Sequence, residues 1–296
     1  MKAIIMDRHG GLEVLRYGEL PDPVAGEGEV LVDIHAATVN AADAKVREGG
    51  AYATITKFPY VLGRDFSGVV AALGKGVTDL KVGDAVFGVL AGGHEGTYAE
   101  KVAEKAAIVA RKPDSLSHVD AAALSLTGLT ALVSIEDTIK LKAGETILIQ
   151  GGAGGVAGFA IQLAKLIGAR VITTASPNNH AYVKGLGADQ VIDYSREDFT
   201  KVVKDVDAVF ETVGGDVAMR SFAVLKPGGR AAFIASGAKA PASPRADVQS
   251  LRPAVGRDRP HLERVLHLVA TGAVRTPEVR VFALKDAAEA QRISEG

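Results

Sequence analysis

The stretch from Thr146 to Gly168 constrains the fold of this chain more than any other. It opens on the apolar run Thr146–Ile149, passes through a turn rich in glycine, and continues with apolar residues at helical spacing. A strand, a glycine turn and a helix in that order, with Gly152-x-Gly154-x-x-Ala157 in the turn, form the dinucleotide-binding fingerprint. The early glycines let backbone N–H groups approach a pyrophosphate, and the helix N-terminus adds partial positive charge. Glycine turns without a ligand are also common, so the prediction depends on the flanking strand and helix.

Length and charge narrow the class of protein. With 296 residues, 47% of them hydrophobic, the chain can bury a large core and is expected to form two domains. Lys and Arg total 34 against 35 Asp and Glu, so no basic surplus favours nucleic acid or an anionic membrane as partner. We identify no apolar run long enough to span a bilayer, and the N-terminal residues lack the apolar core of a signal peptide. A cytoplasmic location is therefore expected.

The chain contains no cysteine. This excludes disulfides, a cysteine nucleophile and every zinc site that uses cysteine ligands. The seven histidines do not pair at metal-ligand spacing. His94 lies in a glycine-rich loop and is expected to be solvated, and His35 ends a predicted strand, where it packs or forms a hydrogen bond. No metal site is predicted.

The first third of the chain has the pattern of a partly open β-barrel. Short apolar runs alternate with Gly and Pro, which is typical of antiparallel strands joined by turns. One helix is predicted at Ala41–Glu48. The predicted strands are Ala3–Met6, Val30–Ile34, Ser67–Ala72, Ala85–Val89 and Tyr98–Val102.

After Pro113 the pattern becomes a long helix, Asp120–Ile139, followed by alternating strands and helices. Apolar strands between helices predict a doubly wound parallel sheet. The predicted strands are Glu145–Gln150, Ala169–Thr174, Gln190–Ile192, Ala208–Glu211 and Arg230–Ala235, and the predicted helices are Val156–Ile167, Asn179–Leu186, Arg196–Val203 and Val217–Leu225. Ala238–Arg259 is predicted as loop, Leu262–Ala270 and Asp286–Ser294 as helices, and Val279–Ala283 as a strand.

Several short segments, in this order and spacing, resemble the medium-chain dehydrogenase/reductase superfamily. Within it, the chain resembles the zinc-independent quinone oxidoreductase branch, which includes the zeta-crystallins. The matching segments are Val39–Asp43, Leu62–Gly68, Val82–Val86, Gly96–Glu100, Leu126–Ala131, the glycine turn, Gly187–Asp189, Thr212–Gly215 and Leu225–Gly229. The resemblance implies a GroES-like partly open β-barrel domain, residues 1–115 and 262–296, and a Rossmann domain that binds NADP, residues 116–261.

Departures from the zinc-dependent members of the superfamily are consistent with a metal-free site. Those members carry a cysteine ligand in the segment that matches Val39–Asp43 and a His-Glu pair where this chain has Arg64-Asp65. We expect Arg64 and Asp65 to form a structural polar pair. Family members also continue past a segment like Ala287–Ala290 with a strand containing Gly-Lys, whereas this sequence stops at Gly296, so that strand is absent or the sequence is shortened.

The resemblance implies hydride transfer from NADPH to a quinone or another α,β-unsaturated carbonyl compound. Such acceptors are electrophilic without a Lewis acid, whereas a simple aldehyde normally benefits from zinc. Three hypotheses remain: a quinone reductase, a 2-alkenal or enoyl reductase, and a non-catalytic nucleotide-binding protein of the crystallin or sensor type. The family also commonly dimerises through the edge of its nucleotide sheet, and the apolar segment Ala231–Ala235 permits a homodimer.

Three residues are candidates for the substrate site. By resemblance, Asn40 lies under the nicotinamide and donates a hydrogen bond to the acceptor oxygen; alternatively it caps the helix that begins at Ala41. Asp43 holds the helix start or orders nearby basic residues. By resemblance to the quinone branch, which often has a tyrosine in this loop, Tyr52 is expected to stack on a quinone or to donate a hydrogen bond from its hydroxyl; alternatively it serves only in packing.

The cofactor candidates surround the glycine turn. An NAD site usually ends its second strand with an acid that binds the ribose 2′-hydroxyl, and here that position falls near Thr174, which is uncharged. NADPH is therefore favoured, with hydrogen-bond donors following in the loop and Lys184 on the next helix. By resemblance Thr130 approaches the nicotinamide, unless it is packed in the interior. The full candidate set is Thr130, Gly152, Gly154, Gly155, Val156, Thr174, Ser176, Asn179, Lys184, Val213, Gly214, Ala235 and Ser236.

Overall fold

The computed structural model describes residues 1–50 and 56–295, and contacts within the chain divide it into two units. Unit 1 comprises Met1–Leu126, Gly256–Glu263 and Glu278–Gly296, and unit 2 comprises Thr127–Val255 and Arg264–Pro277. These ranges differ at their edges from the division at residues 115 and 262, because helices α2 (His118–Leu132) and α7 (Arg259–Ala270) each contribute to both units. The division into domains remains a prediction.

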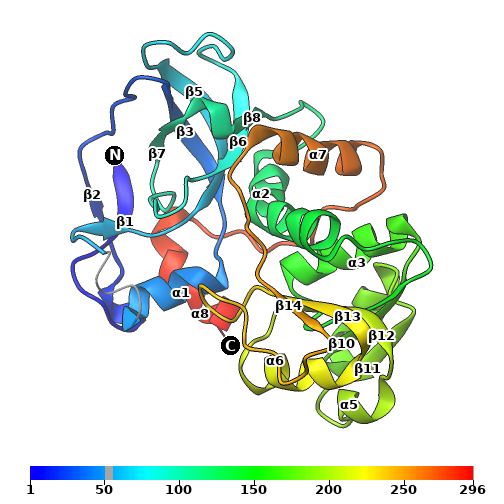
Figure 1. Ribbon diagram of the computed structural model, residues 1–296. Helices are drawn as coiled ribbons and strands as arrows, with labels where there is room; N and C mark the ends of the chain where they lie inside the picture. The colour runs from blue at the N-terminus through cyan, green and yellow to red at the C-terminus, as the bar shows by residue number, and fades with distance from the viewer. Residues whose placement is uncertain (51–55, 296) are drawn as a thin grey trace. The chain divides into compact units, whose positions relative to one another are not determined.

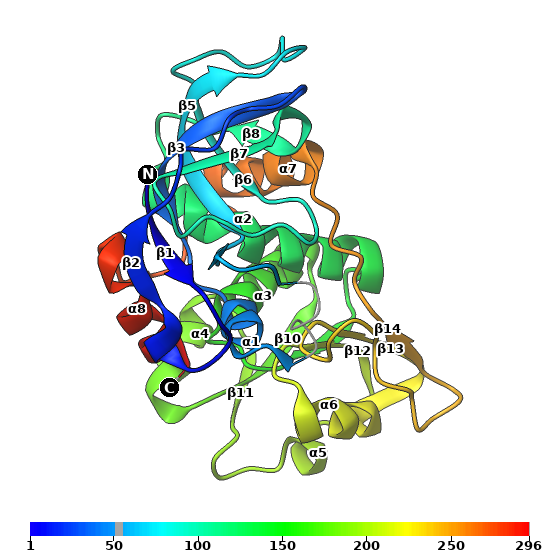
Figure 2. The same cartoon turned by 90° about the vertical axis from the view of Figure 1, so that its left-hand side faces the viewer.

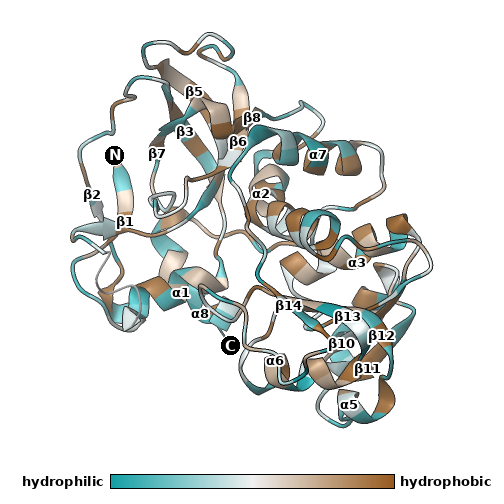
Figure 3. Cartoon of the chain, in the orientation of Figure 1, coloured by the Kyte–Doolittle hydropathy of each residue, from teal (hydrophilic) through white to brown (hydrophobic). Residues whose placement is uncertain are grey.

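Unit 1 is built on two antiparallel sheets. A five-stranded sheet has the order β7-β3-β5-β6-β8, and a three-stranded sheet has the order β2-β1-β4 (Figure 1). Strand β3 carries both hydrophobic brown and hydrophilic teal in Figure 3, and its buried Val30 and Val32 alternate with partly buried neighbours, which is the pattern of a strand with one buried face. This curled sheet confirms the GroES-like, partly open barrel. The strands are β1 (Lys2–Met6), β2 (Arg16–Glu19), β3 (Glu29–Ala37), β4 (Tyr60–Val61), β5 (Asp65–Leu73), β6 (Ala85–Val89), β7 (Lys101–Lys105) and β8 (Val109–Arg111).

Two helices of unit 1 lie side by side in Figures 1 and 2, namely α1 (Ala41–Glu48) and α8 (Ala287–Glu295). Arg47 joins them, although its side chain is only 2% exposed. Its guanidinium donates to Gln291 Oε1 at 2.5 Å and to Glu295 Oε1 at 2.6 Å. A buried charge of this kind is stable because its donors meet acceptors, so Arg47 fixes α1 against α8.

Unit 2 contains a parallel sheet of six strands in the order β11-β10-β9-β12-β13-β14. Strand β9 pairs with β10 on one side and with β12 on the other, so the strand order reverses at β9. Ligands bind at such a switch point in doubly wound sheets. The sheet confirms the Rossmann fold. Its strands are β9 (Thr146–Ile149), β10 (Arg170–Ala175), β11 (Gln190–Asp193), β12 (Val206–Glu211), β13 (Leu225–Phe233) and β14 (Gln249–Leu251).

The helices of unit 2 connect and cover these strands. Along α3, the eight residues from Ala157 to Ala164 are all buried, which fits a helix packed on the sheet. Helix α2 continues as a π-helix, η4 (Val133–Ile139). The other helices are α3 (Gly155–Ile167), α4 (His180–Gly185), α5 (Phe199–Val202) and α6 (Gly215–Ser221).

The combined helix His118–Ile139 is long and apolar enough to cross a membrane by length and composition. The expectation that no run has this length is therefore wrong. Its most apolar window is 72% buried inside the structure, which is typical of a core helix.

Four predicted segments need correction. Residues 279–283 form no strand, and β14 lies inside the segment predicted as loop. Strand β7 begins at Lys101 rather than at Tyr98. Strand β13 lies between β12 and β14, so the segment Ala231–Ala235 is not at the edge of the sheet. The apolar alternation at Val279 and Val281 predicted pairing, but both side chains are exposed and the extended backbone has no neighbouring strand.

Candidate functional site

In unit 2, the glycine turn connects β9 to α3 in the form that the fingerprint predicts. Gly151 has a φ of 68°, which favours glycine. A Cβ on Gly152 would lie 2.1 Å from Thr173 Oγ1, so only glycine fits against β10 there. Gly154 is the N-cap of α3 and provides no capping side chain, and Gly155 and Val156 begin the helix.

The N-terminus of α3 is open to a ligand. Gly154 and Gly155 are exposed, and no acidic side chain lies in the first turn. The first N–H groups of a helix lack intrahelical partners, and the helix dipole favours an anion beside them. These residues therefore fit the pyrophosphate of a dinucleotide.

Thr174 lies beneath the turn rather than at the surface. Its side chain is only 3% exposed, and its hydroxyl donates to Gln150 Oε1 at 2.8 Å and accepts from the Gly151 N–H at 3.0 Å. Gln150 Nε2 in turn donates to Ser221 Oγ at 3.2 Å. This side chain therefore supports the turn, and the predicted role of Thr174 in cofactor binding remains a prediction.

The accessible end of β10 lies two residues further on. Ala175 is the last paired residue and lies opposite Asp193 of β11. Ser176 follows, half-buried, and its Oγ accepts a hydrogen bond from Asn179 Nδ2 at 3.1 Å. Neither residue carries a charge, so the end of β10 presents no carboxylate.

The neighbouring strand places a further residue at this edge of the sheet. Tyr194 follows β11 directly and is 63% exposed, so it lies beside the Ser176 loop in the register of the sheet. Sequence reasoning missed it because it searched only one strand end, and strand adjacency was the available signal. Lys184 is exposed in the last turn of α4.

A buried carboxylate organises the end of β12. Glu211 is fully buried, and its Oε1 accepts hydrogen bonds from the N–H groups of Val213 at 2.7 Å and Gly214 at 2.8 Å. Burial raises the pKa of Glu211. Gly214, with a φ of 88°, caps α6 and approaches Ala235 so closely that its Cβ would lie 3.2 Å from the Ala235 Cβ.

Two other cofactor candidates, Ser236 and Thr130, form hydrogen bonds within the protein. The Ser236 hydroxyl donates to the Lys239 carbonyl at 2.9 Å, which closes the turn after β13. Thr130 is 9% exposed within α2, and its carbonyl accepts from Ser134 Oγ at 2.7 Å. This burial matches the alternative that Thr130 packs in the interior, and its cofactor role remains a prediction.

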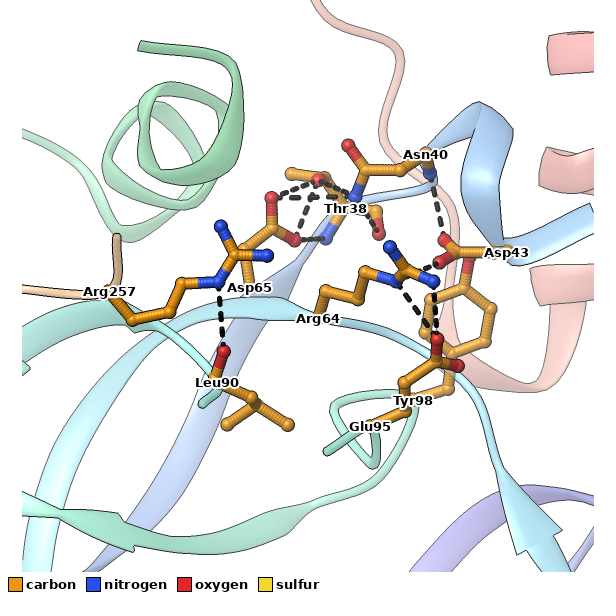
Figure 4. A network of polar contacts seen from close by, with 9 residues as sticks. All are labelled: Thr38, Asn40, Asp43, Arg64, Asp65, Leu90, Glu95, Tyr98 and Arg257. Carbon is orange, nitrogen blue, oxygen red and sulfur yellow. Dashed lines mark hydrogen bonds and ion pairs between the residues drawn. The ribbon is translucent and has the colours of Figure 1, made fainter. Parts of the chain in front are cut away.

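In unit 1, polar side chains converge where β3 ends and α1 begins (Figure 4). They come from segments far apart in the sequence, and the participants are Thr38, Asn40, Asp43, Arg64, Asp65, Glu95, Tyr98 and Arg257. Sequence reasoning identified Asn40 and Asp43 as site residues. Thr38, Glu95, Tyr98 and Arg257 were missed because no local pattern connects them.

Asp43 is fully buried and ties the start of α1 to the barrel. Its Oδ2 accepts from the Asn40 N–H and from the Tyr98 hydroxyl, each at 2.8 Å, and its Oδ1 lies 3.8 Å from Arg64 Nε. Burial raises the pKa of Asp43 to about 6, although these partners oppose the shift. Its expected role in holding the helix start agrees with these contacts.

Asn40 occupies the N-cap of α1, and Asp43 the third helical position. The Asp43 N–H donates to the Asn40 backbone carbonyl at 2.9 Å. Asn40 and Asp43 form a capping box at the start of α1, and the Asn40 amide nitrogen lies 3.2 Å from Thr38 Oγ1. Asn40 is half-buried. Both its position at the cap and its place in the network are thus defined, whereas contact with a substrate remains a prediction.

Asp65 is also fully buried and holds Thr38. Both of its carboxylate oxygens lie 2.7 Å from Thr38 Oγ1, and Oδ1 accepts from the Thr38 N–H at 3.1 Å. Burial raises the pKa of Asp65 to about 7, and the nearby charge of Asp43 adds to the shift.

Arg64 was expected to pair with Asp65, and the ion pairs described here join it to Glu95 and Asp43. Its guanidinium lies 2.8 Å from Glu95 Oε1 and also faces Asp43. Burial raises the pKa of Glu95 to about 7 against the opposing charge of Arg64. Arg257 Nε donates to the Leu90 carbonyl at 3.1 Å, and burial lowers the pKa of Arg257.

Three expectations concern groups outside this network. Tyr52 lies outside the described residues, so its role remains a prediction. Within residues 1–50 and 56–295, no three His, Asp or Glu side chains gather in a group able to hold a metal ion. His35 and His118 stack with ring centroids 4.5 Å apart, and His118 Nδ1 lies 2.8 Å from Ser67 Oγ, so His35 packs at the end of its strand.

Comparison with known proteins gives two family matches. Residues 26–114 match the alcohol dehydrogenase GroES-like domain, and residues 186–296 match a family described as zinc-binding dehydrogenase. The second description concerns the family, because this chain lacks cysteine altogether.

Solved structures resemble the chain over its whole length. The quinone oxidoreductase from Coxiella burnetii is 36% identical, with a TM-score of 0.92, covering 100% of this chain and 95% of that one. The Escherichia coli quinone oxidoreductase complexed with NADPH is 28% identical, with a TM-score of 0.89, covering 100% and 96%.

One curated relative carries a name with a different substrate class. The chloroplastic NADPH-dependent alkenal/one oxidoreductase of Arabidopsis thaliana is 35% identical over 272 residues, which cover 89% of this chain and 69% of the relative. The chain spans about two thirds of the length of the curated relatives it matches, from 66% to 69% for three of them.

Proposed function

We propose a function from the family to which this chain belongs, the zinc-independent quinone oxidoreductase branch of the medium-chain dehydrogenase/reductase superfamily. The chain is an NADPH-dependent oxidoreductase that transfers hydride to quinones or other conjugated carbonyl compounds. The observation that carries this proposal is the open, uncapped N-terminus of α3 behind a glycine turn, in a chain that is 36% identical to a quinone oxidoreductase.

Cofactor binding is assigned to the carboxyl ends of the parallel strands. Gly155 and Val156 offer the first backbone N–H groups of α3 to the pyrophosphate. Gly152 and Gly154 donate their own N–H groups to the carbonyls of Thr174 and Gly151, and their lack of side chains lets the pyrophosphate come close to the turn. Ser176, Asn179 and Lys184 bind the 2′-phosphate, where an acid would repel it. Glu211 holds the β12–α6 turn so that Val213 and Gly214 present their backbone to the ligand, with Ala235 and Ser236 alongside.

The proposed class of hydride acceptor follows from the metal ligands that the described residues could offer. When bound, the dihydronicotinamide supplies the hydride. A conjugated carbonyl accepts hydride without polarisation by a metal, and the described residues offer no cluster of metal ligands. The protein's part is to position and desolvate the reactants.

The test is to mix the protein with NADPH and a panel of quinones and enones while following NADPH absorbance. Acceptor-dependent loss of absorbance is expected, and chelators should leave it unchanged. No loss with any acceptor would favour a nucleotide-binding protein without catalysis, and stoichiometric bound zinc would overturn the metal-free mechanism.

The alkenal or enoyl reductase is the second candidate, and the Arabidopsis relative favours it. The same panel separates the two, because the preferred class shows the larger kcat/KM. A 2-alkenal preferred over all quinones by about tenfold or more would select the second candidate.

We further propose a homodimer and a cytoplasmic location. The edge strands of the six-stranded sheet are β11 and β14, and an edge strand can pair with a second copy of the chain. Light scattering measures the oligomeric state. Curated relatives include mitochondrial and chloroplastic proteins, so fractionation of the source cells must test the location.

A further inference from the structure

Gln150 lies where the glycine turn leaves β9, and its side chain is only 1% exposed. Parallel pairing places Ile149 beside Thr173 of β10 and beside Phe210 of β12. The next residue along the chain therefore lies between the carboxyl ends of these two strands, at the switch point of the sheet. Gln150 is thus placed to contact the segments that follow both strands.

The backbone of Gln150 brings the glycine turn against the turn between β12 and α6. Its N–H donates to the Phe210 carbonyl at 3.0 Å, and its carbonyl accepts from the Thr212 hydroxyl at 2.8 Å. A Cβ on the adjacent Gly151 would lie 3.1 Å from both Thr212 Oγ1 and Val213 Cγ2. The two turns are therefore in close contact within unit 2.

The side-chain carbonyl of Gln150 is held by Thr174. The Thr174 hydroxyl accepts from the Gly151 N–H at 3.0 Å, so its own proton points toward Gln150 Oε1, 2.8 Å away. The Thr174 carbonyl also accepts from the Gly152 N–H at 2.9 Å. Thr174 therefore holds two N–H groups of the glycine turn, and Gln150 fixes the direction of its hydroxyl.

The side-chain nitrogen of Gln150 donates to Ser221 Oγ of α6 at 3.2 Å. The Ser221 hydroxyl gives its one proton to the Val217 carbonyl at 2.8 Å, so it meets Gln150 as an acceptor. A flipped amide would oppose oxygen to this acceptor and N–H to the Thr174 proton. Thr174 and Ser221 are at most 3% exposed, so water does not compete, and one orientation of Gln150 connects the glycine turn to α6.

We infer that Gln150 is a positioning residue for the cofactor, which holds the glycine turn and α6 in one geometry before the cofactor binds. This inference rests on the proposed function, in which the turn receives the pyrophosphate and Val213 and Gly214 lie beside the same ligand. A site that is already ordered loses less conformational freedom on binding, so more of the contact energy appears as affinity. Gln150 acts through these two segments, because both ends of its amide are used inside the protein.

The test compares two buried glutamines of unit 2. Gln150→Met keeps the approximate length of the side chain but removes both hydrogen bonds of the amide. Calorimetry should show that it binds NADP⁺ about tenfold more weakly, an effect of the size that such hydrogen bonds contribute.

Gln162→Met is the matched control. Gln162 lies further along α3, where its amide donates to the Gly158 carbonyl and accepts from the Arg275 N–H. This variant should lose stability in urea unfolding to a similar degree, because it also removes buried hydrogen bonds. Its NADP⁺ affinity should change by less than about twofold.

A fragment of the cofactor separates the two ends of the Gln150 amide. With the 2′-phosphate proposed at the end of β10 and the pyrophosphate at β9, the nicotinamide half falls on the β12 side. The fragment 2′,5′-ADP lacks that half. Ser221→Ala removes only the link to α6, so it should weaken NADP⁺ binding by about threefold or more and leave 2′,5′-ADP binding unchanged. Gln150→Met should weaken both ligands, because it also releases Thr174.

The outcomes distinguish this inference from the proposed function. If the wild-type protein does not bind NADP⁺, both are overturned. If it binds NADP⁺ and Gln150→Met binds it equally well, or if Gln162→Met weakens binding as much, only the inference is overturned. Ser221→Ala decides the question if Gln150→Met does not fold: equal effects on NADP⁺ and 2′,5′-ADP would show that Gln150 does not tie α6 to the cofactor site.

Discussion

The Tyr98 hydroxyl donates a hydrogen bond to Asp43 Oδ2 at 2.8 Å, and both side chains are buried. Tyr98→Phe removes this donor and leaves a buried carboxylate with one partner fewer. We expect the free energy of unfolding to fall by about 1–3 kcal/mol, measured by urea titration. Tyr17→Phe, at a tyrosine that is 48% exposed, is the control and should change stability by no more than about 0.5 kcal/mol. Equal effects of the two variants would contradict the importance of the Asp43 contact.

The raised pKa of Asp65, about 7, makes stability depend on pH. The folded state binds the proton more tightly than the unfolded state, so this contribution is present below about pH 4 and is lost as pH rises through 7. Asp65→Asn does not titrate. Its free energy of unfolding, relative to wild type, should therefore be more favourable at about pH 8 than at about pH 5.

The control for this prediction is Asp7→Asn. Asp7 is paired with Arg16, whose hydrogen bond lowers its pKa, so it stays ionised across this range. Its difference from wild type should be the same at both values of pH. An Asp65→Asn difference that is also constant would show that Asp65 is already ionised in the folded protein at low pH.

Substitutions at Gly152 and Gly154 should have different effects on the protein. In Gly152→Ala the new Cβ would lie 2.1 Å from Thr173 Oγ1, which donates to the Ile149 carbonyl at 2.6 Å. We expect this variant to lose about 1–3 kcal/mol of stability. In Gly154→Ala the nearest atom is the Gly151 carbonyl oxygen at 3.4 Å, so the fold should tolerate it.

Gly154→Ala should nevertheless weaken NADP⁺ binding by about tenfold, because a methyl group there obstructs the approach of the pyrophosphate to the backbone. Urea unfolding without cofactor and calorimetry with NADP⁺ measure the two effects separately. Unchanged NADP⁺ affinity in Gly154→Ala would remove this turn from the cofactor site.

Cofactor preference should depend on charge at Ser176. Ser176→Asp places a carboxylate beside the proposed 2′-phosphate, so NADP⁺ affinity should fall by about tenfold or more while NAD⁺ affinity is retained. Ser176→Asn, of the same size without charge, should keep the NADP⁺ preference. A similar loss for both variants, or a loss for both cofactors, would place the 2′-phosphate elsewhere.

The fold could largely be predicted because its main strands are apolar runs with clear boundaries. The turn from β9 to α3 and helix α1 follow from local sequence alone. Strand β14 could not be predicted, since the short Gln249–Leu251 segment becomes a strand only by pairing with β13. The Val279 segment shows the opposite error, where an alternating pattern has no partner to pair with.

The candidate site was predictable only where its residues lie close in the sequence. Asn40 and Asp43 belong to one helix start, whereas Glu95 and Tyr98 reach Arg64 and Asp43 through the curvature of the barrel. Asn40 Nδ2 also lies 3.5 Å from Asp65 Oδ2, although the two residues are 25 positions apart in the sequence. Such long-range polar contacts leave no periodic signal in the chain.

At the end of β10, Thr174 and Ser176 lie two residues apart but have different surroundings. The buried Thr174 supports the turn through Gln150 and Gly151, while Ser176 lies beyond the last paired residue, Ala175. A substitution at Ser176 therefore leaves the internal support of the turn intact. With Ser176 at the proposed 2′-phosphate site, evolution could change the cofactor preference by substitution at one accessible position, without first rebuilding the nucleotide fold.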